Sequence, residues 1–160
     1  YAWAHQVSSY MVIGSGSDAG NAIEIALKIL ETVPPPANGF DVEEYTHGPI
    51  FATQPERGLI VLQGAAPGKK RCVEAAYATS AMTDHILVVT DDPAAGWPEQ
   101  ATVWSIPTGF GDAGFILSPM PAQLLVYYLC LALDKNADHA STRSDKSLAL
   151  WQRAFPPGTH

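Results

Sequence analysis

The sequence predicts an α/β fold, a three-layer α-β-α sandwich around a parallel, doubly wound sheet. Short apolar runs alternate along the chain with longer helical stretches, which is typical of parallel strands joined by helical crossovers. The runs are apolar at nearly every position rather than at every second one, so we expect strands that are buried on both faces. The four expected strands cover about residues 10–13, 58–62, 85–90 and 101–106.

Three helices are expected to join or follow these strands. They cover about Asn21 to Val33, Lys69 to Met82 and Pro121 to Leu133. The three prolines at 34–36 end the first helix, because proline removes a backbone donor and restricts the residue before it. The segment from residue 136 onward is polar. We therefore expect one domain over residues 1–135 and a tail over 136–160 that contributes to the site or to a dimer interface.

Composition limits the classes of function. The 160 residues are 47% hydrophobic and 16% charged, which fits one globular domain. The formal net charge of -7 supplies no basic patch, so nucleic acid is not expected as a partner. Cys72 and Cys130 have no metal-ligand spacing and form no disulfide framework, which favours a reducing cytoplasm and predicts no metal site. The longest apolar run, Leu124–Leu133, is too short to span a bilayer, so no membrane association is expected.

A glycine-rich loop, Gly14-Ser15-Gly16-Ser17, follows the first expected strand and precedes the first expected helix. Free backbone N–H groups and the helix dipole favour an anion at this place in a parallel sheet. An equally good interpretation is a tight turn with Ser17 or Asp18 as the helix N-cap. The loop does not match the dinucleotide-binding motif, because the third glycine of that motif would fall at Ala19.

The first expected helix carries one polar stripe on an otherwise apolar surface, and we expect the helix to be buried around most of its circumference. Asn21, Glu24, Lys28 and Glu31 share one side at helical spacing. The stripe is either the solvent face, with Glu24 and Lys28 as an ion pair, or the lining of a cleft in which a carboxylate serves as a base. Its position beside the glycine loop favours the cleft.

His47 lies in the segment Glu44-Tyr-Thr-His-Gly-Pro49, where glycine and proline make an irregular backbone. Such a loop presents an imidazole that titrates near neutral pH. A single histidine is more often structural or solvent-exposed than catalytic, so His47 carries no functional assignment from its own surroundings.

Taken together, these motifs resemble the second SIS (sugar isomerase) domain of the glucosamine-6-phosphate synthase family. That domain has a glycine loop, an A-x-E-x-A-L-K-x-x-E helix and an E-x-x-H-G-P loop, which are similar to Gly14–Ser17, Ala22–Glu31 and Glu44–Pro49. The similarity continues through the helix that begins Pro121-Ala-Gln-Leu-Leu and into Arg143-Ser-Asp-Lys-Ser147, and so covers about Met11 to Leu148. Arg143 and Lys146 are one residue closer together than in the synthase pattern.

The resemblance implies an SIS fold and a role for each matching residue. Glu31 matches the carboxylate that moves a proton between C1 and C2 of the sugar, and His47 matches the histidine of ring opening, which reaches the site from a neighbouring subunit. Glu24 and Lys28 match residues that line and order the site. Lys146 matches, to within one position, the family's tail lysine that forms an imine with the keto sugar. The substrate-binding loop corresponds to Gly14, Ser15, Gly16 and Ser17.

The resemblance also implies partners and a substrate. We expect a hexose 6-phosphate as ligand, no cofactor, a homodimer, and a preceding SIS half that carries the main phosphate loop. The opening Tyr1–Gln6 has no initiator methionine and suggests a helix that began earlier, so the chain is interpreted as a fragment with little activity of its own. Isomerase, aminotransferase, deaminase and deglycase chemistry all remain open, as does a non-catalytic sensing or structural module.

Overall fold

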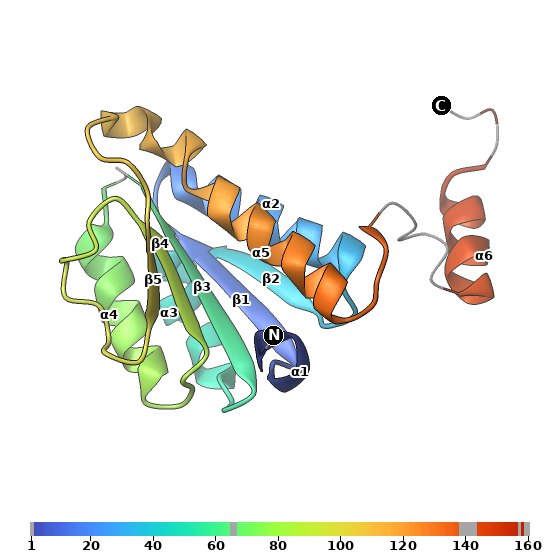
Figure 1. Ribbon diagram of the computed structural model, residues 1–160, viewed down its shortest axis with the longest axis horizontal. Helices are drawn as coiled ribbons and strands as arrows, with labels where there is room; N and C mark the ends of the chain where they lie inside the picture. The colour runs from blue at the N-terminus through green and yellow to red at the C-terminus, as the bar shows by residue number, and fades with distance from the viewer. Residues whose placement is uncertain (1, 65–66, 138–143, 157, 159–160) are drawn as a thin grey trace.

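A five-stranded parallel sheet forms the centre of the computed structural model, which describes residues 2–64, 67–137, 144–156 and 158 (Figure 1). The strands lie in the order β2-β1-β3-β4-β5, and every neighbouring pair is parallel. Their bounds are β1 Ser9–Gly14, β2 Ala37–Asp41, β3 Arg57–Gln63, β4 Ile86–Thr90 and β5 Thr102–Ser105. The predicted α/β fold is therefore confirmed, and the fifth strand, β2, lies in the segment expected to be irregular.

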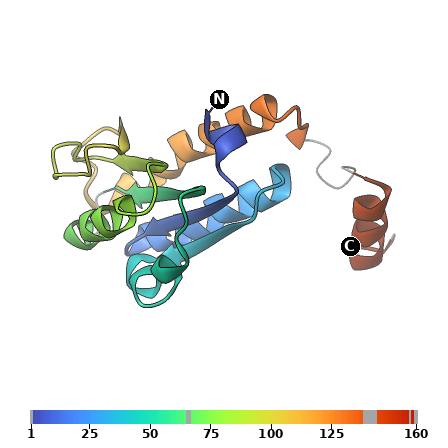
Figure 2. The same cartoon turned by 90° about the horizontal axis from the view of Figure 1, so that it is seen from below.

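Helices cover both faces of the sheet (Figure 2). One face packs against α1 (Ala2–Gln6), α2 (Ser17–Thr32) and α5 (Pro119–Ala132), and the other against α3 (Val42–Thr46) and α4 (Lys69–Ser80). Successive strand residues feed the two cores in turn, because side chains alternate across a strand. In β1, Tyr10 and Val12 belong to the first core and Met11 and Ile13 to the second.

Helix α2 is buried on one side only. Ala22, Ile25 and Ile29 are completely buried against the sheet. Ile23, Leu27 and Leu30 point outward with exposed fractions of 59%, 44% and 48%. The prediction that this helix is buried around most of its circumference is therefore wrong, and an apolar strip stays in contact with solvent.

Helix α5 has a similarly one-sided contact with the sheet. It continues from the short 3-10 helix η2 (Gly111–Ile116), and the combined segment Gly111–Ala132 is long and apolar enough to cross a membrane by length and composition alone. Core helices of sheet proteins meet the same criterion, and Ala122, Val126 and Leu129 pack here against the sheet. Only 28% of its most apolar stretch is buried, which leaves a broad apolar outer side.

The polar tail contains a helix that the sequence analysis did not foresee, α6 (Asp145–Ala154). It begins at Ser144, whose hydroxyl accepts a hydrogen bond from the backbone N–H of Ser147 at 3.1 Å. None of its residues is buried, and the helix stands apart from the sheet domain (Figure 1). Helix α6 therefore adds nothing to the buried core of the sheet domain.

The buried thiol of Cys72 predicts a weakening of the fold in alkali. Burial raises its pKa from 9.0 to about 12. The unfolded chain loses this proton near pH 9 while the folded chain keeps it, so the stabilisation is complete below pH 9 and is lost as the pH rises toward 12. We expect Cys72→Ala to remove up to about 1.4 kcal/mol per pH unit of this dependence.

Urea unfolding at a series of pH values on both sides of pH 9 measures the effect. Tyr10, whose pKa burial raises to about 12, contributes equally in both proteins and cancels from the comparison. Identical pH dependence of the unfolding free energy in the parent and in Cys72→Ala would contradict the prediction.

Candidate functional site

The carboxyl edge of the sheet is where a parallel α/β fold binds its ligands, at the point where the strand order reverses. Here that point lies between β1 and β3, because the chain leaves β1 toward β2 and returns to β3 on the other side. Gly14 ends β1, Gln63 ends β3 and Thr90 ends β4 at this edge. The loops after β1 and β3 therefore meet above the centre of the sheet.

The loop after β1 packs tightly against the loop after β3. Ser15 is 5% exposed, and its hydroxyl donates a hydrogen bond to the carbonyl of Pro67. A Cβ on Gly14 would overlap the backbone of Asp18, and one on Gly68, at φ +95°, would overlap the Ser15 side chain. These glycines permit the close approach of the two loops.

The helix N-cap at the end of this loop is Gly16, at φ 57°, rather than Ser17 or Asp18. Ser17 is the first residue of α2 and is exposed. In the predicted substrate loop Gly14–Ser17, Ser17 is therefore exposed to solvent, whereas the Ser15 hydroxyl is hydrogen-bonded within the protein.

The buried carboxylate of Asp18 is the polar centre of this edge. One oxygen accepts a hydrogen bond from the backbone N–H of Gly64 at 2.7 Å, at the end of β3. The other accepts from the hydroxyl of Ser118 and from Asn21 Nδ2, the latter at 3.1 Å. Asn21 also donates to the carbonyl of Phe115 at 2.7 Å. The sequence pattern indicates only a capping role for Asp18, because its partners Gly64 and Ser118 lie 46 and 100 residues away and no local signal reveals them.

A charged cluster, Glu24–Lys28–Glu31, lies along the outer side of α2. Lys28 Nζ lies 3.0 Å from Glu31 Oε2 and 3.4 Å from Glu24 Oε1. Hydrogen bonds to Glu31 and then to Glu24, together with the attraction of their charges, raise the pKa of Lys28. The three side chains are 39–48% exposed, so the cluster is open to a ligand and its ammonium stays protonated at neutral pH.

The cluster borders a groove between α2 and α5. Lys28 and Thr32 line one wall and Gln123, Val126 and Tyr127 the other, around a pocket of about 280 Å³. Of the polar stripe predicted from the sequence, Lys28 lines this groove, and Glu24 and Glu31 flank Lys28 on the outer side of α2. The exposed apolar strip Ile23, Leu27, Leu30 belongs to the same helix, so the charges stand between two apolar surfaces.

His47 lies on the other side of the sheet from this cluster. It caps the C-terminus of α3, which packs in the second core, whereas α2 packs in the first. Its side chain is 76% exposed, and Nδ1 lies 2.7 Å from the carbonyl oxygen of Glu43. A carbonyl only accepts, so this contact makes Nδ1 the protonated nitrogen and leaves Nε2 as the basic one. The fold does not bring His47 and Glu31 together within one chain.

Lys146 is exposed on α6, outside the sheet domain. Of the predicted site residues, Glu24, Lys28 and Glu31 are therefore in contact with one another, and the glycine loop lies at the N-terminus of the same helix. It leaves His47 and Lys146 on separate surfaces.

A second ionic group, which the sequence analysis did not single out, lies at the same carboxyl edge. Lys69, at the start of α4, lies 3.1 Å from Asp91 Oδ1 and 3.4 Å from Asp92 Oδ2. Partial burial lowers the pKa of Lys69, but its hydrogen bonds to the two aspartates outweigh this and the net shift is upward. The group joins the loops after β3 and β4, and its one ammonium offsets only one of the two carboxylate charges.

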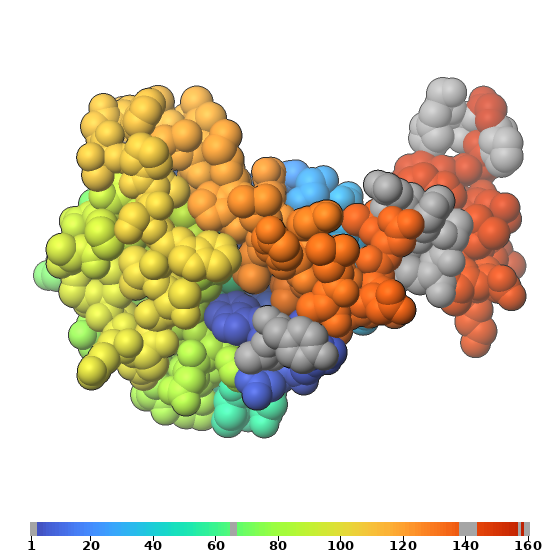
Figure 3. Space-filling view, viewed as in Figure 1, coloured from blue at the N-terminus to red at the C-terminus, as the bar shows by residue number. Residues whose placement is uncertain are grey.

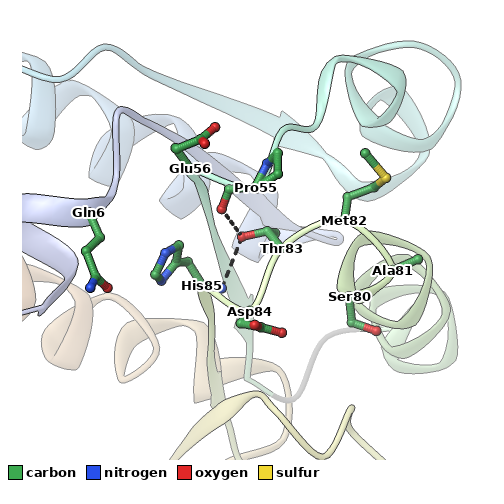
Figure 4. A pocket seen from close by; sticks show the side chains of 9 residues that line it. All are labelled: Gln6, Pro55, Glu56, Ser80, Ala81, Met82, Thr83, Asp84 and His85. Atoms are coloured by element: carbon green, nitrogen blue, oxygen red, sulfur yellow. Dashed lines mark hydrogen bonds between the residues drawn. The ribbon is translucent and has the colours of Figure 1, made fainter.

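A larger pocket, of about 630 Å³, lies at the amino edge of the sheet (Figure 4). It is lined by residues such as Gln6, Glu56 and His85, and the hydroxyl oxygen of Thr83 in its wall lies 2.9 Å from the carbonyl oxygens of both Pro55 and Arg57. This is the edge away from the strand-to-helix loops, so we do not assign it as the site. Within the ranges that the structure describes, no group of three or more His, Cys, Asp or Glu is placed to hold a metal.

No protein-family model matches the chain. A curated relative, the glutamine–fructose-6-phosphate aminotransferase (isomerizing) of Rhizobium leguminosarum bv. viciae, is 26% identical over 132 residues, which are 80% of this chain and 21% of that protein. The chain therefore spans about a fifth of the length of this relative.

Solved structures have the same architecture. The C-terminal domain of glucosamine-fructose-6-phosphate aminotransferase from Francisella tularensis superposes with a TM-score of 0.75 at 16% identity, over 84% of this chain and 38% of that one. Tagatose-6-phosphate ketose/aldose isomerase from Escherichia coli gives 0.64 at 22% identity, over 80% and 36%. The fold is that of SIS domains, and the resemblance to the glucosamine-6-phosphate synthase family is confirmed.

The network around Asp18 predicts a large loss of stability on its removal. Asp18→Ala leaves the buried N–H of Gly64 and the hydroxyl of Ser118 without their acceptor. We expect the free energy of unfolding to fall by about 2–4 kcal/mol, measured by chemical denaturation. Ser17→Ala, one residue away and exposed, is the matched control and should change it by less than about 0.5 kcal/mol. Equal effects of the two substitutions would show that Asp18 does not hold this edge together.

Proposed function

We propose that the chain is a phosphosugar-binding SIS domain of an enzyme that moves a proton between C1 and C2 of a hexose 6-phosphate. The observation that carries this proposal is the Glu24–Lys28–Glu31 cluster, which lies beside a groove on the helix that follows the glycine loop. The aminotransferase relative supports it, as does the likeness in fold to a tagatose-6-phosphate isomerase. The reaction is an aldose–ketose isomerisation, either alone or coupled to gain or loss of an amino group.

Glu31 is the base in this proposal. Its carboxylate removes a proton from C1 of the open-chain ketose, the electron pair of that C–H bond forms a C1–C2 double bond, and the π pair of the C2 carbonyl moves onto O2 to give an enediolate. The same carboxyl group returns the proton to C2, while the hydroxyl proton on O1 passes to O2 and an aldehyde forms at C1. Lys28, 3.0 Å from Glu31, orients the carboxylate and offsets the negative charge that develops on the sugar oxygens.

Glu24 holds the other side of Lys28, at 3.4 Å, and so positions the ammonium between two carboxylates. In this arrangement Glu24 acts through Lys28, whereas Glu31 contacts the substrate. Glu24 and Glu31 are seven residues apart, about two turns along the helix, and therefore lie next to different parts of a bound sugar.

His47 opens the sugar ring in this proposal, from a second chain of a homodimer. Its Nε2 accepts the proton of the anomeric hydroxyl, and the imidazolium then protonates the ring oxygen as the C1–O or C2–O ring bond breaks. The contact of Nδ1 with the Glu43 carbonyl supports this role, because it selects the tautomer in which Nε2 is basic. The 76% exposure of the side chain leaves it available to another chain.

The start of α2 is the proposed anchor for the sugar phosphate in this chain. The helix N-terminus and the exposed Ser17 offer donors to an anion there. Ser15 is already engaged with Pro67, so its hydroxyl is a weaker candidate than the sequence suggested. We propose that most of the phosphate contacts come from a second SIS half.

A non-catalytic sensing or structural module is the second candidate. The position of Lys146 favours it, since this lysine lies on α6 and is exposed rather than gathered with Glu31. Such a module would bind the phosphosugar without exchanging its protons.

Substitution of Glu31 separates the two candidates in the full-length protein. Glu31→Gln keeps the size of the side chain but removes the basic oxygen, so we expect solvent deuterium incorporation at C1 or C2 to fall by roughly 10²–10⁴-fold with hexose 6-phosphate binding retained. Glu24→Gln is the matched control on the same face and should lose much less. Unchanged exchange in Glu31→Gln would remove it from the mechanism, and parent protein that binds the sugar phosphate without any exchange would favour the sensing module.

A further inference from the structure

The end of α3 that carries His47 is held by a side chain from the neighbouring helix, Arg71 of α4. Its Nε atom donates to Glu43 Oε1 at 3.0 Å, and its Nη2 atom donates to Thr46 Oγ1 at 3.0 Å. Its Nη1 atom donates to Glu74 Oε2 on α4 itself at 3.3 Å, which restrains the guanidinium from its own helix. The planar guanidinium holds these three groups in one fixed geometry, which a lysine ammonium does not reproduce.

The backbone carbonyl of Glu43 is the point at which these contacts meet the histidine. It accepts from the His47 backbone N–H at 3.2 Å and from the Thr46 hydroxyl at 3.0 Å, and it lies 2.7 Å from His47 Nδ1. The Glu43 carboxylate stands nearby, with Oε2 3.9 Å from Nδ1, which is beyond hydrogen-bond distance. This carboxylate is therefore a competing acceptor for the same nitrogen, and its hydrogen bond to Arg71 restrains it.

We infer that Arg71 is a positioning residue for His47. By holding the Glu43 carboxylate, it leaves the backbone carbonyl as the acceptor for Nδ1–H, and a backbone group fixes the direction of the ring better than a mobile side chain does. The inference rests on the proposed function, in which Nε2 of His47 must reach the ring oxygen of a sugar bound to another chain. Without Arg71, the freed carboxylate would accept the hydrogen bond of Nδ1–H and turn the ring.

The exposure of these side chains indicates that the contacts serve orientation more than stability. Arg71 is 36% exposed and Glu43 56%, and ion pairs this open to water contribute little to folding. The packing of α3 on α4 depends instead on Tyr45, which is completely buried and whose hydroxyl lies 2.8 Å from that of Thr79 on α4. Loss of Arg71 should therefore free the His47 end of α3 while leaving the helix in place.

Arg71 is also remote from the other half of the proposed chemistry in its own chain. Helix α4 packs in the second core, whereas α2, which carries Glu31, packs in the first. Figure 3 shows α4 (green) and α5 (orange) on separate parts of the surface. A substitution at Arg71 should therefore leave the groove between α2 and α5 unchanged, and its effect on turnover reports on His47.

The test compares two substrates of the full-length protein: a ketohexose 6-phosphate that the parent isomerises, and the 5-deoxy analogue of that sugar. The analogue lacks the hydroxyl that closes the ring, so it stays open and needs no ring opening. We expect Arg71→Gln to lower kcat/KM for the first substrate by roughly 10-fold and to leave the analogue within about 2-fold of the parent. Lys70→Gln is the matched control, since it removes the same charge from a side chain that is 91% exposed, and it should change neither.

Removal of the Glu43 carboxylate distinguishes positioning from a structural role. In Arg71→Gln combined with Glu43→Ala, the backbone carbonyl is again the acceptor for Nδ1–H, so we expect most of the lost activity on the ring-closed substrate to return. A structural tie between α3 and α4 would instead be weakened further by the second substitution. Equal loss on both substrates in Arg71→Gln, full activity on both, or no recovery in the double variant would each overturn the inference.

His47→Asn separates a failure of this inference from a failure of the proposed function. We expect it to lower kcat/KM for the ring-closed substrate alone, by roughly 10²-fold or more. If it does so and Arg71→Gln does not, the inference about Arg71 fails and the proposed role of His47 stands. If His47→Asn slows neither substrate, or if the parent acts on no ketohexose 6-phosphate, both fail.

Discussion

The carboxylate of Asp18 is the contact on which the arrangement of the site depends. It lies in the first turn of α2 and receives hydrogen bonds from the end of β3 and from Ser118, immediately before α5. A buried carboxylate is tolerated only when hydrogen bonds satisfy it, so these partners must stay in place. Asp18 therefore fixes the start of α2 relative to both the sheet and α5. The groove lies between these two helices, with Lys28 beside it, and the hydrogen bonds of Asn21 to Phe115 and Ser118 join the same two segments.

The surface around the Glu24–Lys28–Glu31 cluster is unusual for the outside of a monomer. Charged residues on an outer helix face normally have polar neighbours, but these three lie between the exposed strip of Ile23, Leu27 and Leu30 and the apolar outer side of α5. Exposed apolar surface of this extent is typical of an interface. Covering it would remove water from around Glu31 and strengthen its interaction with Lys28. We propose on this basis that the complete site forms only when another chain or domain packs here.

Much of the fold could be predicted from the sequence, because apolar strands and proline or glycine breaks are local signals. The polar stripe on α2 was also predicted, since helical spacing alone places Glu24, Lys28 and Glu31 together. The network of Asp18, Gly64 and Ser118 could not be, because its members become neighbours only when distant segments fold together. Strand β2 was missed because Ala37–Asp41 contains asparagine and glycine and lies at the sheet edge, where side chains are only partly buried. Helix α6 was missed because it is short and follows a polar stretch.

We propose that catalysis needs Glu31 of one chain and His47 of another. The most direct test mixes two full-length variants, Glu31→Gln and His47→Asn, after each has been shown to be inactive on a hexose 6-phosphate. Dimers that contain one copy of each variant hold one site with both Glu31 and His47 intact and one site with neither. Recovery of isomerase activity in the mixture after subunit exchange is the predicted result. A mixture as inactive as its two components, despite proven formation of the mixed dimer, would contradict a site shared between two chains.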